Sequence, residues 1–575
     1  MRCFQLCRWF LVCLAFLHVT VVSAASVAPA ASERGMVVTA QHLATQVGAD
    51  VLAQGGNAVD AAVAVGYALA VVYPAAGNLG GGGFMTLHLT DGRETFIDFR
   101  EKAPLGATAD MFLGPDGNVV KGRSTVGHLA VAVPGTVSGL ELALARYGTR
   151  PRAALMAPAI RLADRGFVLD AADVRMFEAV ADGLRADPPT AAIFLKGGAV
   201  PRAGDRLVQK DLAATLRRIA SRGADGFYRG PVADAIAASS AAGGGLIRHA
   251  DLRAYAALER KPVECDYRGY RIVSAPPPSS GGVVICEILN VLEGYPLKDL
   301  GFWSAQSVHY QIEAMRHAYV DRNSYLGDPD FVTNPVDRLL DKGYAAKVRE
   351  VIDPSKAGVS KNIRPGVPPH EGTNTTHYFI ADRFGNAVSV TYTLNEWFGA
   401  RVTAAGTGVL LNNEMDDFTA KRGVPNAYGL VQGEANAIAP GKRPLSSMSP
   451  TIVTRGGKPV MVLGTPGGSR IITTVVHTIL NMVDYGMDVQ EAVDAPRFHQ
   501  QWLPDVTHIE PFAISPDTQR LLVAMGHNLG KPQEANHVAA IVIGSTPRLD
   551  GTSSGTTLFF GANDPRRRSG LAKGP

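Results

Sequence analysis

Residues 372–395 contain two strand-like runs around a polar turn at residues 382–386, a pattern that predicts a β-hairpin. Counting residue pairs outward from the turn places Thr375 beside Thr393, with Asn395 just beyond them. Threonine also occurs in strands simply because β-branched side chains suit them. The convergence of three polar side chains at the open end of one hairpin makes this end a candidate functional site.

The second strand of this hairpin, residues 387–393, has two unlike faces. If Asp382 and Ala387 close the turn, alternate side chains point to opposite sides of the sheet. One face is apolar and consists of Val388, Val390 and Tyr392, and the other is small and mostly polar and consists of Ala387, Ser389, Thr391 and Thr393. Thr393 is therefore expected on the small, polar face.

A second site-like element spans residues 459–468, where a short apolar strand runs into a sharp turn that contains Gly467 and Gly468. The apolar periodicity of residues 472–483 predicts an amphipathic helix after the turn. Adjacent glycines at a strand-to-helix turn can direct successive backbone N–H groups to one point, where they stabilise an anion or a developing oxyanion. Glycine pairs at such turns also occur only to relieve the backbone, so the pattern alone leaves both interpretations open.

Residues outside these two elements supply charges of both signs and hydroxyl groups. They are Arg100 with Glu101, Glu414, Asp416 with Asp417, and Ser446 with Ser447. Together such groups can hold a zwitterion, because carboxylates bind an ammonium group while a guanidinium and hydroxyls bind a carboxylate. Taken one at a time, each charge is equally well explained as part of a solvated surface.

Two other kinds of site lack their usual signatures. The chain has no HExxH and no CxxC motif, which argues against zinc proteases and redox dithiols. The glycine run at residues 80–83 follows a helical pattern and has no GK[ST] continuation, so it is poor evidence for a phosphate-binding loop. We expect no metal and no organic cofactor.

Residues 1–24 combine a basic start, an apolar run and a small-residue end, a pattern typical of a cleaved secretory signal peptide. The apolar run is shorter than the roughly 20 residues that a membrane-spanning helix needs. The mature chain is therefore expected in the periplasm or outside the cell. Loss of Arg2 and Arg8 lowers the formal net charge from +4 to +2, too close to neutral to indicate a nucleic-acid partner.

Only Cys265 and Cys286 of the five cysteines lie beyond this segment. An oxidising compartment would permit a disulfide between them. Cys286 also lies in an apolar, helix-like run, where a free thiol acts as a small core residue. The sequence leaves both states open.

The rest of the chain alternates helical and strand-like segments and contains no internal repeat. Residues 40–72 predict two helices, the second apolar all round and therefore buried, and residues 84–99 predict two strands. Residues 135–258 are mainly helical in pattern. With 46% apolar and 19% charged residues, the chain can bury a large core.

Several motifs closely resemble those of γ-glutamyltranspeptidases. They are Asn-Thr-Thr-His-Tyr at residues 374–378, Thr-Tyr-Thr-Leu-Asn at 391–395, Leu-Asn-Asn-Glu-Met-Asp-Asp-Phe at 411–418, Arg-Pro-Leu-Ser-Ser-Met-Ser-Pro-Thr at 443–451 and Pro-Gly-Gly-Ser-Arg at 466–470. Further matches lie upstream at residues 56–62, 98–101 and 276–282. The resemblance follows the family in order over essentially the whole mature chain.

This resemblance implies an α+β fold, the αββα sandwich of N-terminal-nucleophile hydrolases, in which two stacked antiparallel sheets lie between helix layers. It also implies a precursor that cuts itself before a threonine, giving a signal peptide of residues 1–24, a large subunit of residues 25–374 and a small catalytic subunit of residues 375–575. Cleavage would free the α-amino group of Thr375, whose pKa is roughly 8, to act as the base for its own hydroxyl. His377 is an alternative base on the same face, but the family assigns it no such role and we interpret it as structural.

The resemblance also implies a role for each site residue. Thr375 would be the nucleophile, Thr393 would orient it, and the amides of Gly467 and Gly468 would form the oxyanion hole. The α-carboxylate of a γ-glutamyl donor would be held by Arg100, Ser446 and Ser447. Its α-ammonium would be held by Asn395, Glu414 and Asp417. Tyr428 lies in a segment, residues 421–429, that resembles the lid loop of the family and would cover the bound glutamyl group.

The implied activity is transfer of the γ-glutamyl group of glutathione and related amides to water, an amino acid or a dipeptide, through an ester on Thr375. Large and small subunits would form a heterodimer. A glutaryl acylase of the same fold is one alternative, but it would have no α-ammonium for Glu414 and Asp417 to bind. A non-catalytic periplasmic binder of γ-glutamyl compounds is another, and it would not need the Thr375 hairpin.

Overall fold

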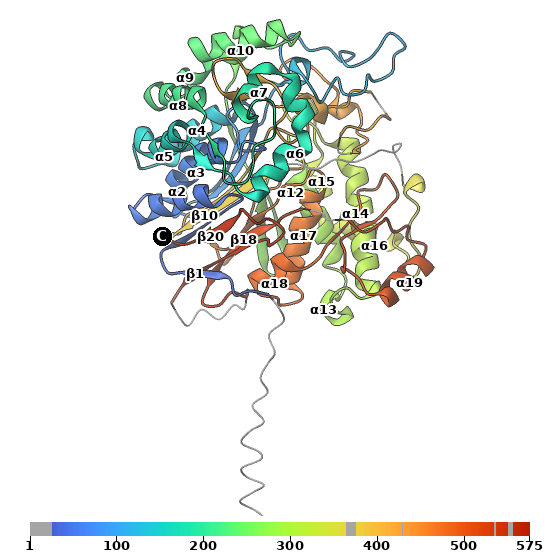
Figure 1. Cartoon of the computed structure of the whole chain (residues 1–575). Coiled ribbons are helices and arrows are strands. Elements are labelled where there is room, and N and C mark those ends of the chain that lie inside the picture. Colours follow the sequence, from blue (N-terminus) through green and yellow to red (C-terminus); the bar gives the residue numbers. More distant parts are fainter. Residues whose placement is uncertain (1–25, 364–374, 422, 428, 534–535, 550–555) are drawn as a thin grey trace, which may run out of the picture.

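The computed structural model describes residues 26–575 except 364–374, 422, 428, 534–535 and 550–555. Two seven-stranded antiparallel sheets stack face to face, and helices cover the outer face of each (Figure 1). The predicted αββα sandwich is confirmed.

The first sheet contains the predicted hairpin and has the strand order β20-β2-β10-β11-β3-β4-β7. Its strands are β2 (Gly35–Thr39), β3 (Gly82–His88), β4 (Glu94–Phe99), β7 (Leu258–Arg260), β10 (Thr376–Asp382), β11 (Ala387–Thr393) and β20 (Leu571–Lys573). Strands β3 and β4 confirm the two strands expected within residues 84–99.

The hairpin of β10 and β11 differs from the prediction by one position at its turn. Ala387 pairs with Ala381 rather than with Asp382. The backbone N–H of Asp382 donates to the carbonyl of Asn386 at 3.0 Å, and the Asp382 carboxylate accepts from the backbone N–H of Asn386 at 3.0 Å. The carboxylate thus holds a tighter turn than the sequence count assumed, and the register places Thr375 opposite the last residue of β11.

The second sheet has the strand order β1-β19-β18-β15-β14-β9-β8. Its strands are β1 (Ala30–Ser32), β8 (Val263–Tyr267), β9 (Tyr270–Ser274), β14 (Thr451–Arg455), β15 (Lys458–Gly464), β18 (Ala539–Gly544) and β19 (Leu558–Asn563). Apolar side chains of both sheets meet between them, among them Val38 and Phe379 from the first sheet and Val462 and Ile541 from the second. Three short pairs complete the strands: β5 (Phe167–Val168) with β6 (Arg206–Leu207), β12 (Thr403–Ala404) with β13 (Val409–Leu410), and β16 (Phe498–His499) with β17 (His508–Ile509).

The helices that share a core with the first sheet come from the first half of the chain. They are α2 (His42–Ala53), α3 (Ala58–Val72), α4 (Thr136–Tyr147), α5 (Arg152–Arg165), α6 (Ala171–Ala186), α7 (Pro188–Phe194), α8 (Lys210–Arg222), α9 (Asp225–Tyr228), α10 (Pro231–Ala242) and α11 (His249–Ala254). Every residue of α3 is buried, as its apolar composition predicted. The apolar face of β11, including Val388 and Val390, packs into this core.

The second helix layer covers the other sheet. It contains α12 (Gly281–Leu292), α13 (Leu297–Leu300), α14 (Ala305–Tyr325), α15 (Val336–Leu339), α16 (Lys342–Val351), α17 (Arg470–Val483), α18 (Val489–Asp494) and α19 (Pro516–Ala524). Helix α17 follows the glycine turn as predicted, but it is buried on nearly all sides, including the polar Thr473, His477 and Asn481. The predicted apolar side, including Ile472, Val475 and Ile479, packs into the core of this layer, so the amphipathic pattern is confirmed, and the neighbouring elements β15, α12 and α18 help to bury the rest of the helix.

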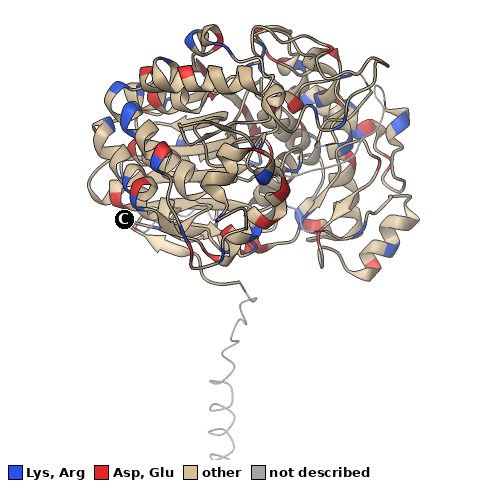
Figure 2. Ribbon diagram, turned by 45° about the horizontal axis from the view of Figure 1, so that its top comes forward, with Lys and Arg blue, Asp and Glu red and all other residues tan. Residues whose placement is uncertain are grey.

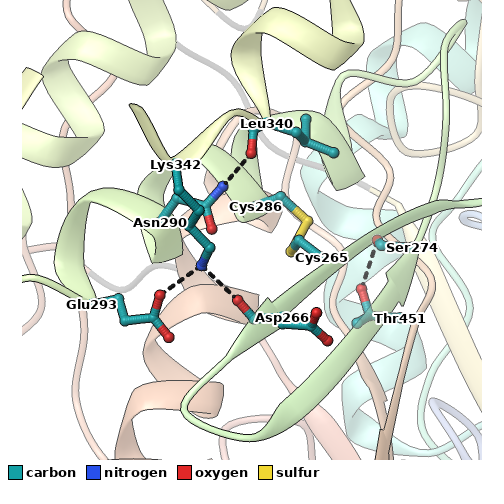
Figure 3. The surroundings of a disulfide bond; sticks show 9 residues. All are labelled: Cys265, Asp266, Ser274, Cys286, Asn290, Glu293, Leu340, Lys342 and Thr451. Carbon is teal, nitrogen blue, oxygen red and sulfur yellow. Dashed lines mark hydrogen bonds and ion pairs between the residues drawn. A yellow bond between two sulfur atoms is a disulfide. The ribbon is translucent and has the colours of Figure 1, made fainter. Parts of the chain in front are cut away.

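A disulfide joins Cys265 on β8 to Cys286 on α12, with 5.9 Å between their Cα atoms (Figure 3). Strand β8 is the edge strand of the second sheet. The bridge therefore fastens the edge of the sheet to the helix layer above it, and it decides between the two states that the sequence left open.

Positive and negative side chains are interspersed over the outer helices and loops (Figure 2). This distribution agrees with the small formal net charge of the chain, +4. Across the described residues, no helix is long and apolar enough to cross a membrane.

Candidate active site

A small cavity of about 20 Å³, large enough for about one water molecule, lies at the open end of the β10–β11 hairpin. The predicted site residues that line it are Thr375, Thr393, Asn395, Arg100, Glu414, Asp417, Ser446, Ser447 and Gly468. Gly467 does not line the cavity, and Tyr428 lies outside the described residues.

The end of β11 carries the polar residues that surround Thr375. Thr375 itself is only 4% exposed, and the hydroxyl of Thr393 accepts the backbone N–H of Asn395 at 2.8 Å. Asn395 adopts a left-handed conformation with φ of 79°, which asparagine tolerates better than most residues. Its side-chain amide donates to the carbonyl of Asn413 at 3.0 Å. The strand thus ends in a tight, hydrogen-bonded turn beside Thr375.

Arg100 follows β4 and lies at the centre of a buried group of charges. Its Nη1 lies 2.8 Å from a carboxylate oxygen of Glu414 and 3.4 Å from Glu101, and its Nη2 donates to Asp417. Sequence analysis assigned Arg100 to one end of a zwitterion and the two acids Glu414 and Asp417 to the other. In the structure they pair directly with one another, because charges removed from water need partners.

The acids of this cluster outnumber Arg100. Burial raises the pKa of Glu414, and it raises the pKa of Glu101 to about 8 against the opposing effect of Arg100. Burial alone would lower the pKa of Arg100, but the nearby acids Glu414, Asp417 and Glu101 raise it above its usual value. Oε2 of Glu414 is ion-paired with Arg100, whereas Oε1 has no hydrogen-bond partner among the described residues. The cluster therefore leaves one buried carboxylate oxygen of Glu414 open to a donor group.

Ser446 and Ser447 lie on a segment that is fastened to the loop before α12. The backbone N–H of Ser446 donates to the carbonyl of Pro278 at 2.9 Å. The carbonyl of Ser446 accepts both the backbone N–H of Ser280, at 2.8 Å, and its hydroxyl, at 2.7 Å. These bonds fix the two serines against the wall of the cavity.

The glycine turn lies at the N-terminus of α17. Gly467 and Gly468 have φ values of 128° and 56°, conformations that glycine adopts without a steric penalty. A Cβ atom on Gly467 would lie 2.5 Å from the side chain of Asn536. Because the N-terminus of a helix carries unpaired N–H groups and partial positive charge, the turn is suited to an oxyanion beside Thr375.

His377 lies on β10 but does not line the cavity. Its imidazole contacts the hydroxyl of Thr391, and a Cβ atom on Gly464 would lie 2.0 Å from its ring. Burial lowers the pKa of His377 well below its usual value, so the ring is neutral. These contacts agree with the structural interpretation of His377.

Sequence reasoning missed one charged residue of the cavity wall, Arg322 on α14. The other lining residues that it missed are Leu430, Leu445, Met448, Ser469 and Ile471. The sequence around Arg322 mixes apolar and polar residues without a motif, so nothing separated this arginine from those of a solvated helix face. Only the packing of α14 against residues 445–448 brings it to the site.

Among the described residues, one group of side chains has ligand atoms close enough to share a metal ion: His309, Glu313 and His527, all buried. The two imidazoles are already hydrogen-bonded to each other at 2.8 Å, and Glu313 is paired with Arg316. None of the three lines the cavity of Thr375.

The chain was compared with known families and proteins. The sequence model of the family described as gamma-glutamyltranspeptidase matches residues 44–574. A relative from Pseudomonas sp. (strain A14), named glutathione hydrolase proenzyme, is 68% identical over 554 residues, which are 96% of each chain. A protein of the same name from Escherichia coli (strain K12) is 50% identical over 555 residues, which are 95% of this chain and 93% of that protein.

Among solved structures, a cephalosporin acylase from Bacillus halodurans superposes with a TM-score of 0.82 at 29% identity, over 97% of this chain and 99% of the acylase. The fold thus extends over the whole of that enzyme. The match of the family model, the identity to the two relatives and the cavity around Thr375 agree with one another. The chain belongs to the γ-glutamyltranspeptidase family.

Proposed function

We propose that this chain is a self-processing glutathione hydrolase and transferase. It takes the γ-glutamyl group of glutathione or a related amide and passes it to water, an amino acid or a dipeptide. The names of the relatives support the donor. The observation that carries the proposal is the pairing of Arg100 with Glu414 and Asp417 in the cavity of Thr375, because only a donor with both a carboxylate and an ammonium group satisfies both signs of charge.

Processing would precede catalysis. The Thr375 hydroxyl attacks the carbonyl of Asn374, which lies outside the described residues, and the acyl group moves from nitrogen to oxygen. Water then hydrolyses the ester, which leaves residues 25–374 as the large subunit and residues 375–575 as the small one. The new α-amino group of Thr375 becomes the general base.

In the transfer reaction the α-amino group of Thr375 accepts the proton of its own hydroxyl while Oγ1 attacks the γ-carbonyl of the donor. The hydroxyl of Thr393 lies at the same end of the hairpin and orients the nucleophile. Backbone N–H groups at Gly467 and Gly468 stabilise the oxyanion, and the leaving amine takes the proton from the α-ammonium. Water or an amine acceptor then attacks the ester and regenerates Thr375.

The carboxylates of Glu414 and Asp417 would confer selectivity for the donor's α-ammonium. Oε1 of Glu414 has no hydrogen-bond partner among the described residues, and an ammonium group brings three N–H donors. A glutaryl group has the same length and the same scissile bond but no amine. Its carboxylate would draw Arg100 away from Glu414 and Asp417 without supplying an ammonium group in return, which would leave both acids without a partner.

The test compares γ-glutamyl and glutaryl p-nitroanilides. Sites that bind a substrate amine can reject the analogue lacking it by about four orders of magnitude, so we expect turnover of the glutaryl anilide to be poor. Asp417→Asn should lose activity mainly on the γ-glutamyl donor and so reduce the discrimination. Equal kcat/KM for the two anilides would favour the acylase, and a Thr375→Ala chain as active as the unmodified one would favour a mechanism without this nucleophile.

We also propose export to the periplasm or the outside of the cell. The pattern of residues 1–24, which lie outside the described residues, supports it, and so does the Cys265–Cys286 disulfide, because disulfides persist in oxidising compartments. Cell fractionation with detection of a fragment that starts near residue 25 would test it. An uncut N-terminus in the cytosolic fraction would contradict it.

A further inference from the structure

Arg322 on α14 is a buried cation whose partners are all neutral. It is 1% exposed. Its guanidinium donates to the hydroxyls of Ser280 and Ser447, both at 2.9 Å, and to the side-chain oxygens of Asn323 at 2.8 Å and Gln432 at 3.4 Å. No carboxylate among the described residues lies within ion-pair distance of it.

Arg322 differs in this respect from Arg100. The charge of Arg100 is already balanced by Glu414 and Asp417. Arg322 has no such contact pair: burial lowers its pKa to about 10 although the more distant Asp417 raises it, and it remains protonated at neutral pH. A buried charge without a counter-ion is unfavourable, so an anion that enters the cavity gains more from Arg322 than from a guanidinium that is already paired.

The hydrogen bonds of Arg322 lead to both serines of the predicted carboxylate site. Because the oxygen of Ser447 accepts a hydrogen bond from Arg322 Nη2, its own O–H can point to a ligand. The hydroxyl of Ser280 accepts from Arg322 Nε and itself donates to the carbonyl of Ser446 at 2.7 Å. One guanidinium thus fixes the segment that carries both hydroxyls.

We infer that Arg322 is a positioning and specificity-determining residue for the α-carboxylate of the donor, acting through Ser447 and Ser446 and through its unbalanced charge. This inference rests on the proposed function. Arg322 belongs to residues 25–374 and the two serines belong to residues 375–575. The carboxylate site is therefore built across the processing point, and the large subunit supplies both of its arginines.

The experiment measures Arg322→Gln and Arg322→Lys with two substrates. One is the γ-glutamyl p-nitroanilide, and the other is the 4-aminobutanoyl p-nitroanilide, which keeps the amine and the scissile bond but lacks the α-carboxylate. For Arg322→Gln we expect KM for the γ-glutamyl donor to rise about 10- to 100-fold with a smaller change in kcat, as for loss of a hydrogen-bonded charge. The kcat/KM of the 4-aminobutanoyl substrate should change by less than about threefold.

Arg322→Lys keeps the charge and should recover part of the lost affinity, although a lysine cannot reach both serines with a planar fork. Adding Arg322→Gln to Ser447→Ala should raise KM less than adding it to the unmodified enzyme, because the two residues share one interaction. Equal losses on both substrates in a processed Arg322→Gln enzyme would mean a merely structural role and would overturn the inference.

Arg567→Gln serves as the matched control. Arg567 is half-buried over the ring of Tyr73, at 4.6 Å, has no ion pair with a described carboxylate and does not line the cavity. Its replacement should leave the ratio of the kcat/KM values for the two substrates unchanged. If the unmodified enzyme cleaves the γ-glutamyl anilide but Arg322→Gln leaves both KM values unchanged, the inference fails alone. If the unmodified enzyme does not cleave that anilide, the proposed function fails first.

Discussion

Arg100 and Glu414 are each at most 1% exposed and lie 2.8 Å apart. In water an ion pair of this kind contributes little to stability, but in a cavity closed to solvent the same contact is strong and direction-dependent. Binding a zwitterion would exchange these internal pairs for pairs with the ligand, so charge is conserved in the cavity. At the residue scale, selectivity for a ligand therefore depends on which buried charges lack a partner in the empty cavity.

The first prediction concerns the geometry of Arg100 rather than its charge. Arg100→Lys keeps the positive charge but loses the planar fork that can engage a carboxylate through two bonds. Removing a desolvated charged hydrogen bond costs about 2–5 kcal/mol, so kcat/KM for the γ-glutamyl anilide should fall roughly 30- to several-thousand-fold.

Processing of the Arg100→Lys chain needs no donor carboxylate and should proceed normally. Arg93→Lys is the matched control, because Arg93 is exposed and paired only with the exposed Asp91. Near-normal kcat/KM in a fully cleaved Arg100→Lys enzyme would show that Arg100 is not a carboxylate anchor.

At the scale of elements, two turns bring the reacting groups together. The β10–β11 hairpin carries Thr375, and the turn between β15 and α17 carries Gly467 and Gly468. The two strands belong to different sheets, and the side chain of Ser389 on β11 donates to the carbonyl of Leu463 on β15 at 3.2 Å. This bond between sheets holds the nucleophile strand against the strand that leads to the glycine turn.

The second prediction tests the glycine turn. Gly467→Ala would force an alanine to φ of 128° and place its Cβ 2.5 Å from Asn536, so the backbone must shift. Loss of an oxyanion donor lowers kcat by about 10²–10³-fold, and we expect a loss of this order with a smaller change in KM.

Gly457→Ala is the control for this variant. Gly457 also has a positive φ, 75°, but lies in the turn between β14 and β15 with open space around it. It should lower stability by about 1 kcal/mol without altering kcat. A Gly467→Ala enzyme with unchanged kcat would remove this turn from the mechanism.

At the scale of the whole molecule, the two proposed subunits share both sheets. In the first sheet, β10, β11 and β20 come from residues 375–575, and β2, β3, β4 and β7 come from residues 25–374. Strand β2 lies between β20 and β10, and β3 lies beside β11, so strands of the two segments pair directly. In the second sheet, β1, β8 and β9 come from the larger segment and the other strands from the smaller one. A cut at residue 374 would therefore divide the chain without dividing its core.

The third prediction follows from this shared core. The processed enzyme should run as one species in gel filtration and as two bands, about 37 and 21 kDa in proportion to the 60.7 kDa of the full chain, in denaturing gels. Both cysteines of the disulfide lie in the larger fragment, so the bands should separate without a reductant.

The Thr375→Ala chain should remain a single polypeptide. In the unmodified enzyme, N-terminal sequencing should show that the smaller fragment begins at Thr375. A start at Thr376 would move the nucleophile to the opposite face of β10 and would contradict the site described above.

Much of the site was predictable because its residues are close together in local patterns. The hairpin, the glycine turn and the acidic residues each follow from alternation, turn residues or a motif within about twenty positions. The predicted pairing at the turn of the hairpin was wrong by one residue, because the Asp382 side chain tightens the turn. The periodicity of α17 identified its core-facing side correctly, but periodicity does not report whether neighbouring elements also cover the polar positions.

The sequence by itself determined the strands and helices that surround Thr375, the pairing of β10 with β11 and, through its motifs, the family. Only the tertiary structure decided that Arg100 pairs with Glu414 and Asp417, that Cys265 is bridged to Cys286 and that Arg322 reaches the cavity wall. These contacts join residues that lie far apart along the chain or on separate elements. Local patterns fix which groups a segment presents, whereas the partners of a buried charge depend on how distant elements pack around it.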